Sequence, residues 1–212
     1  LTQSKNIMQK IFVTGISTGV GKTIASAIFT EALQADYWKP VQAGDLDNSD
    51  TDKVKSLISN NKTKFHPCSY ELTAPLSPHA AAENEGIRID RFHINEPKTE
   101  NNLIIEGSGG ILVPLNEEDT LFDIIMPDYK VVVVSRNYLG SINHSLLTIN
   151  WLQNKGYDVS VLFSGEANPQ TENIILIKTG VLSLGRIDEE TTFDKVVIKK
   201  YADKFEGVLR SL

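Results

Sequence analysis

The feature that most constrains this chain is a glycine-rich segment that follows a short apolar run and precedes a helical pattern. Residues 15–23 read Gly-Ile-Ser-Thr-Gly-Val-Gly-Lys-Thr, after the run Lys10 to Thr14 and before apolar residues at helical spacing up to Leu33. Strand, loop and helix in this order are typical of a phosphate-binding loop (P-loop), whose backbone N–H groups converge on phosphate oxygens at a helix N-terminus. Gly15 stands one residue further from Gly21 than the pattern G-x-x-x-x-G-K-T requires, so the loop is a variant.

The side chains of this loop predict a site for a nucleoside triphosphate with Mg²⁺. Lys22 is expected to reach the outer phosphates, and the Thr23 hydroxyl is expected to ligate the metal. The other residues of this segment expected to contact the nucleotide are Gly19, Val20, Gly21 and Ile24. A P-loop alone predicts nucleotide binding and leaves the reaction open.

Further apolar runs predict the rest of a sheet. Their continuous apolar character is typical of parallel strands that are covered on both faces; they are Tyr37 to Val41, Leu103 to Ile105, Val131 to Val134 and Val159 to Phe163. Helical patterns lie between and after them, clearest over 142–152 and 197–212. We predict a single doubly wound, mostly parallel α/β sheet of the P-loop NTPase type, in one catalytic domain over 8–212. Residues 1–7 are interpreted as a leader or an expression remnant, and Asp45 to Asp52 and Asn60 to Lys64 as exposed loops.

Composition excludes several classes of partner. The net charge is -6 with scattered Lys and Arg, whereas nucleic-acid surfaces cluster positive charge. No apolar run approaches the length that spans a bilayer, and the single cysteine, Cys68, cannot form an internal disulfide. We expect a cytoplasmic protein that binds small molecules, without nucleic acid or membrane. His79 and His144 are interpreted as packing or hydrogen-bonding residues, since the four histidines lack zinc-type spacing.

Three charged residues outside the P-loop are candidates for the site. Glu106 ends an apolar run at the edge where open α/β sheets bind ligands, and glycine-rich residues follow it, so it is the best candidate for a second metal ligand. Asp50 is weaker on local grounds, because its acidic stretch is more often a solvated loop. Lys39 interrupts an apolar run, where it either meets an anion or extends its ammonium group to solvent from a strand end.

Six motifs in sequence order resemble the dethiobiotin synthetase family. They are Gly15-x5-Gly21-Lys22-Thr23, Lys39-Pro-Val-Gln-Ala-Gly44, Asn48-Ser-Asp50, Leu76-Ser-Pro-His79, Glu106-Gly-Ser-Gly-Gly110 with Val113-Pro114, and Leu139-Gly-Ser-Ile-Asn-His144. The resemblance implies a cytoplasmic homodimer that uses ATP, Mg²⁺ and carbon dioxide to close a cyclic urea on 7,8-diaminononanoate in biotin synthesis. The active site would be shared between subunits.

The resemblance also assigns roles to residues. Thr23, Asp50 and Glu106 match the magnesium ligands, and Lys22 and Lys39 match the lysines that meet the phosphates and the carbamate. Gly107, Ser108 and Gly109 are expected beside the nucleotide; the residues expected near the diamine are Thr18, Ala43, Gly140, Ser141, Ile142 and Asn143. The last four resemble a helix start whose N–H groups receive the substrate carboxylate across the dimer.

Departures from the family pattern and two rival interpretations remain. Ala43 stands where many members carry a hydroxyl near the carbamate, so turnover is expected to be lower. Gly165-Glu166 stands where better-known members read adenine with Asn-Asp, so preference for ATP is expected to be loose. Gly185-Arg-Ile-Asp188 lacks the proline expected after a similar glycine turn. The rivals are a related P-loop amide ligase, which usually carries a glutamine-hydrolysing domain, and a partition-type regulatory ATPase, which typically has an early P-loop lysine where Ile16 and Ser17 stand.

Overall fold

Seven parallel strands form the central sheet of the computed structural model, which describes residues 8–212. Their order across the sheet is β4-β2-β6-β1-β7-β8-β9. The strands are β1 Lys10–Gly15, β2 Asp36–Trp38, β4 Phe65–His66, β6 Leu103–Gly110, β7 Lys130–Arg136, β8 Val159–Ser164 and β9 Leu182–Ile187. The predicted doubly wound parallel sheet is confirmed.

The order of the strands creates a crevice beside β1. From β1 the chain passes to β2 on one side, and from β6 it crosses over β1 to β7 on the other, so the winding reverses next to the central strand. Ligands of open α/β sheets bind outside the carboxyl ends of the strands at such a switch point. The P-loop leaves β1 at this edge.

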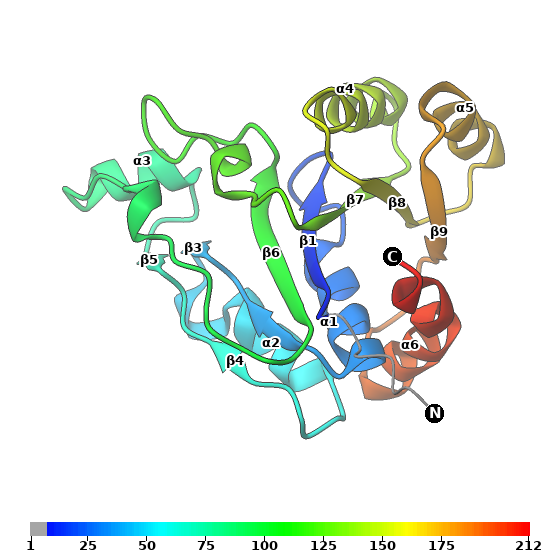
Figure 1. The fold of residues 1–212 in the computed structure, drawn as a ribbon, viewed down its shortest axis with the longest axis horizontal. Coiled ribbons are helices and arrows are strands. Elements are labelled where there is room, and N and C mark those ends of the chain that lie inside the picture. The colour runs from blue at the N-terminus through cyan, green and yellow to red at the C-terminus, as the bar shows by residue number, and fades with distance from the viewer. Residues whose placement is uncertain (1–7) are drawn as a thin grey trace, which may run out of the picture.

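Helices cover both faces of the sheet. In Figure 1, α4 and α5 lie on one face, and α1 and α6 lie on the other. The helices are α1 Lys22–Leu33, α2 Asp50–Leu57, α3 Pro78–Asn84, α4 Ser141–Asn154, α5 Pro169–Thr179 and α6 Lys195–Arg210. Short 3₁₀ turns occupy η1 Leu46–Asn48, η2 Arg91–His93 and η3 Leu121–Ile124.

The two predicted helical patterns correspond to α4 and α6. Helix α6 buries Tyr201 and Phe205 as its spacing predicts, and Asp194 caps its N-terminus by accepting a hydrogen bond from the backbone N–H of Val197. The buried side chains of α4, α6 and the strands belong to one hydrophobic cluster. This packing fixes the carboxyl ends of β1, β2 and β6 relative to one another.

The predicted strand from Tyr37 to Val41 is wrong as a single element. Strand β2 ends at Trp38, and the chain resumes as β3 (Val41–Ala43), which pairs with β5 (Tyr70–Leu72) in a separate two-stranded parallel sheet. Pro40 lies between them, and proline lacks the N–H that a continuing ladder would use. Lys39 therefore sits at the break between two sheets.

The structure corrects two further predictions about local structure. The acidic stretch is only partly a loop, because α2 begins at Asp50 behind a capping box in which Ser49 and Asp52 bond reciprocally. Glu106 lies inside β6, which continues to Gly110 through a register shift against β1, and not at its end. The predicted loop at 60–64 is confirmed, and the prediction for residues 1–7 lies outside the described part of the chain.

Among the helices of residues 8–212, none combines the length and the apolar composition that crossing a bilayer requires.

Candidate active site

The P-loop adopts a conformation that depends on its glycines. Gly21 has a φ of +96°, a left-handed conformation that side chains disfavour. A Cβ on Gly15 would lie 2.6 Å from Cγ2 of Val20 and 2.8 Å from the carbonyl oxygen of Ser17. The loop therefore curls tightly between the end of β1 and the start of α1.

Lys22 lies against this curl and is largely buried. Its Nζ donates to the carbonyl oxygen of Ser17 at 3.2 Å, and the residue is 7% exposed. Burial lowers the pKa of Lys22 to about 8, and the nearby charge of Lys39 acts in the same direction. An anion in the loop would favour the charged form, as a triphosphate does.

Glu106 receives hydrogen bonds on both carboxylate oxygens. It is fully buried; Oε1 accepts from the Thr23 hydroxyl at 2.9 Å and from Lys39 Nζ at 3.2 Å, while Oε2 accepts from the Tyr37 hydroxyl at 3.0 Å. A buried carboxylate is tolerated only when it is paired and hydrogen-bonded, and these three donors meet that need.

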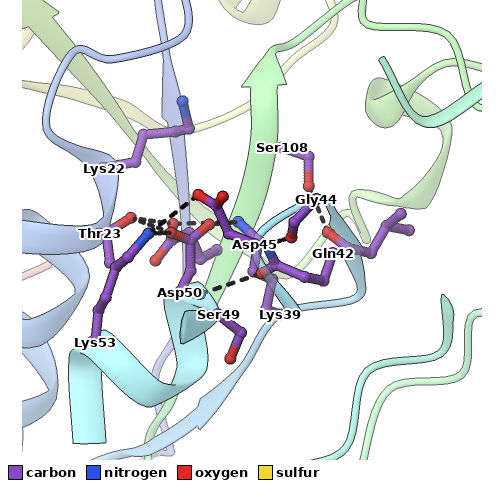
Figure 2. Close-up of polar contacts among 12 residues, drawn as sticks. Lys22, Thr23, Lys39, Gln42, Gly44, Asp45, Ser49, Asp50, Lys53 and Ser108 are labelled. Carbon is purple, nitrogen blue, oxygen red and sulfur yellow. Dashed lines mark hydrogen bonds and ion pairs between the residues drawn. The ribbon is translucent and has the colours of Figure 1, made fainter. Parts of the chain in front are cut away.

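Asp50 completes the cluster from the first turn of α2. Figure 2 shows Thr23, Lys39 and Asp50 converging. Lys39 Nζ lies 2.6 Å from Asp50 Oδ2, and the Thr23 hydroxyl lies 3.0 Å from Asp50 Oδ1. Burial works to raise the pKa of Asp50, but the charge and hydrogen bond of Lys39 outweigh it and hold that pKa below its ordinary value.

Lys39 is the cation at the centre of this arrangement. Burial works to lower its pKa, but the charges of Glu106 and Asp50 outweigh burial and raise it, so the ammonium group stays charged. Lys39 is 2% exposed, which excludes the interpretation of a strand-end lysine that extends into solvent.

A cavity of about 850 Å³ lies over these groups. Most of the residues predicted from the sequence line it: Thr18, Gly19, Gly21, Lys22, Thr23, Ile24, Lys39, Ala43, Asp50, Glu106, Ser108 and Gly109. Val20 and Gly107 do not, because Val20 is buried against Gly15, and Gly107 packs against Phe12 and Leu121.

The helix start at 140–143 is separate from this cavity within one protomer. Gly140, Ile142 and Asn143 line a second cavity of about 800 Å³, which Glu166 and Asn168 also line. Ser141 is fully buried at the first position of α4. His144 accepts or donates a hydrogen bond with the Tyr138 hydroxyl at 2.7 Å, as the hydrogen-bonding interpretation predicts.

Sequence reasoning missed three residues of the site. Lys53 lies 3.8 Å from Asp50 Oδ1, one helical turn along α2. Gln42 accepts from the backbone N–H of Asp50 at 3.2 Å, and Tyr37 reaches Glu106 from the neighbouring strand. Lys53 could have been found only by predicting that α2 begins at Asp50. Residues 50 and 53 then lie on the same face of the helix, three positions apart.

Comparisons with known proteins show to which family this chain belongs. A family model described as an AAA domain matches residues 9–196. The ATP-dependent dethiobiotin synthetase BioD of Christiangramia forsetii is 52% identical over 195 residues, covering 92% of this chain and 94% of that protein. The chain belongs to the dethiobiotin synthetase family. The protein of the same name from Cytophaga hutchinsonii is 48% identical and covers 93% of this chain and 97% of its own length. The resemblance of the six motifs to dethiobiotin synthetases is thereby confirmed.

Solved structures share the fold of this dethiobiotin synthetase relative at much lower identity. A ParA family ATPase from Chlorobium tepidum has a TM-score of 0.59 and 11% identity, with 98% of each chain covered. A plasmid partition protein from Borrelia burgdorferi has a TM-score of 0.60 and 16% identity, with 97% and 99% covered. Identities this low show the P-loop fold alone, so the partition-type interpretation gains nothing beyond the fold.

Proposed function

We propose that the protein is an ATP-dependent dethiobiotin synthetase, a cyclo-ligase that closes the ureido ring on 7,8-diaminononanoate with carbon dioxide in biotin synthesis. The observation that carries the proposal is the convergence of Thr23, Asp50, Glu106 and Lys39 at the P-loop of a chain in this family. We expect the reaction in the cytoplasm, with neither nucleic acid nor membrane as a partner.

The oxygen atoms of Thr23, Asp50 and Glu106 suit Mg²⁺. Oγ1 of Thr23 lies 3.0 Å from Asp50 Oδ1 and 2.9 Å from Glu106 Oε1. Adjacent ligands of an octahedral Mg²⁺ with bonds of ~2.1 Å are about 3 Å apart. The single hydroxyl proton of Thr23 serves only one of the two carboxylates at a time, so this hard-oxygen set fits a cation. A bound Mg²⁺ supplies charge stabilisation for the triphosphate.

The two lysines divide the remaining work. Lys22 and the P-loop N–H groups hold the outer phosphates; Lys39 faces the cavity beside Ala43 and meets the carbamate. Lys39 is paired to both metal-ligand carboxylates here, so a cation at the three oxygens would compete for its partners and leave the ammonium group to an anionic substrate. No side chain has to form a covalent intermediate.

The bond changes are those of carbamate activation. One substrate amine attacks carbon dioxide and loses a proton, which gives a carbamate. A carbamate oxygen attacks the terminal phosphorus of ATP, ADP leaves, and a mixed carbamic-phosphoric anhydride forms. The second amine attacks the carbonyl carbon and loses a proton, and phosphate leaves as the ring closes. Lys22 and Lys39 stabilise the negative charge that moves between these oxygens.

We further propose a homodimer in which Gly140 to Asn143 of one subunit receive the substrate carboxylate bound at the P-loop of the other. Backbone N–H groups at the start of α4 are donors for an anion. Leu139 is 104% exposed and Leu147 is 63% exposed beside this helix start, which is the apolar surface a second copy would cover. Sedimentation velocity tests the dimer, and a monomer with full activity would contradict it.

Nucleotide selectivity is expected to be loose. Gly165 has a φ of +84° and offers no side chain to a base; a Cβ there would lie 3.3 Å from Glu189 Oε2. The family's Asn at this position supplies an amide that this chain lacks. Comparing phosphate release with ATP, GTP and CTP tests this proposal, and a preference for ATP above a hundredfold would contradict it.

The deciding experiment is a reaction of purified protein with Mg²⁺, ATP, bicarbonate and 7,8-diaminononanoate. Phosphate release is expected only when the diamine is present, and mass spectrometry should find one dethiobiotin for each phosphate. Diamine-independent hydrolysis stimulated by DNA or lipid would instead identify a regulatory ATPase.

A further inference from the structure

Tyr37 is a buried side chain of β2 that the proposed reaction does not use. It is fully buried, and it stands opposite Ile104 in the register between β2 and β6, two residues before Glu106. Its hydroxyl reaches Glu106 Oε2 at 3.0 Å. The ring is held against Phe65, with ring centroids 5.8 Å apart.

The contacts of Glu106 separate its two oxygens by role. Oε1 faces Thr23 and Lys39, and Oε2 faces Tyr37. Because Glu106 is fully buried, no solvent reaches Oε2 to replace the tyrosine as donor. The phenol of tyrosine carries a proton that it can donate, and the Tyr37 hydroxyl lies 3.0 Å from Oε2, within hydrogen-bond distance.

We propose that Tyr37 is a positioning residue of the magnesium site, whose hydroxyl fixes Oε2 of Glu106 so that Oε1 alone is presented to the metal. The inference rests on the proposed role of Glu106 as a metal ligand. Donors behind metal-ligating groups orient them and commonly change metal affinity by about 10–100-fold when they are removed. The loss of the Tyr37 hydroxyl leaves Oε2 unsatisfied and removes one of the contacts that fix the orientation of the carboxylate.

Metal binding tests this role without turnover. Mn²⁺ is titrated into protein saturated with ADP, and free Mn²⁺ is followed by electron paramagnetic resonance; ADP affinity is measured separately in EDTA. We expect Tyr37→Phe to weaken Mn²⁺ binding about tenfold and to leave ADP affinity in EDTA within about twofold of wild type, since the P-loop is untouched.

Tyr129→Phe is the matched control. Tyr129 is 2% exposed, and its hydroxyl also donates to a carboxylate, Glu96 Oε2, at 2.6 Å, outside the P-loop cavity. The Tyr129→Phe substitution removes the same chemical group as Tyr37→Phe and is expected to leave Mn²⁺ affinity unchanged. An equal loss in both variants would overturn the proposal, as would wild-type Mn²⁺ affinity in Tyr37→Phe or a matching loss of ADP affinity in EDTA.

A second variant keeps the test decisive if Tyr37→Phe folds poorly, and a double variant tests the coupling of Tyr37 to Glu106. Introducing 4-aminophenylalanine at position 37 retains an N–H donor at the same place and is expected to bind Mn²⁺ like wild type; a tenfold loss there would overturn the role. In a Glu106→Gln background, Tyr37→Phe should change Mn²⁺ affinity less than about twofold, because its partner carboxylate is absent. If wild-type protein fails to turn over the diamine, the proposed reaction falls while these binding results still stand.

Discussion

Replacing Lys39 with methionine is expected to destabilise the protein strongly in the absence of metal. Lys39 is 2% exposed, with its Nζ 2.6 Å from Asp50 Oδ2 and 3.2 Å from Glu106 Oε1. Methionine fills a similar volume but leaves two neighbouring carboxylates without their cation. Removing one partner of a buried ion pair costs about 3–5 kcal/mol. For a chain of this size that loss corresponds to about 6–20 °C in Tm.

Chemical and thermal unfolding in EDTA measure this loss, and Lys53→Met is the matched control. Lys53 is also a lysine beside Asp50, at 3.8 Å, but its side chain is 34% exposed. Its loss is expected to cost less than about 1 kcal/mol, because water screens the pair. Mg²⁺ with ADP should narrow the gap between Lys39→Met and wild type, since a bound cation replaces the missing charge.

The difference in stability between wild type and Lys39→Met should also become smaller as the pH falls. The pKa of Asp50 is held below its ordinary value of 3.8 in the folded protein, so its stabilising contribution is present above that value and is lost as the pH falls through the folded pKa. Lys39→Met has no such contribution to lose. In turnover assays the variant should keep its nucleotide affinity, through Lys22, and lose diamine-dependent phosphate release.

Two results would refute this account of Lys39. The first is a Lys39→Met variant no less stable in EDTA than Lys53→Met, which would mean that the carboxylates do not need the buried cation. The second is a loss of ATP affinity without a loss of maximal turnover, which would place Lys39 on the nucleotide and away from the carbamate.

Three other changes test separate features. Because burial lowers the pKa of Lys22 to about 8, ATP affinity measured by calorimetry should fall about eightfold between pH 7.5 and pH 9, as the free lysine loses the proton that the phosphates require; a flat profile would contradict this. Ser49→Ala removes the capping box of α2 and should lower the free energy of unfolding by about 1 kcal/mol in urea. Gly44→Ala puts a Cβ 2.6 Å from Cα of Pro75 at a φ of +75° and should lower the free energy of unfolding by more than about 1–2 kcal/mol. A variant as stable as wild type would show that the loop moves to accommodate the methyl group.

Local sequence patterns predicted much of the fold. The P-loop was predictable because its glycines, lysine and threonine are consecutive and lie between a strand and a helix, so every part of the motif is set by neighbours in the chain. The strands around 103, 131 and 159 were predictable because both faces are buried, which leaves an uninterrupted apolar run. The break after Trp38 was not, because Val41 continues the apolar run in the sequence but belongs to β3, which pairs elsewhere.

Asp50 and Tyr37 show where local reasoning ends. Asp50 sits in an acidic stretch that any solvated loop could have, and its carboxylate gains a role only because α2 brings it to Lys39 and Thr23. Tyr37 reads as an ordinary strand residue, and its hydroxyl matters because β2 lies beside β6 in the sheet.

The sequence by itself determined the class of fold, the nucleotide loop and the family, since each depends on residue order and on spacing within short segments. The tertiary structure decided which charges neutralise which: that Lys39 is buried between two carboxylates, that Glu106 is held on both oxygens, and that Thr23 stands between Asp50 and Glu106. Electrostatic pairing depends on distance in space and on exclusion of water, and both arise only when strands far apart in the chain become neighbours.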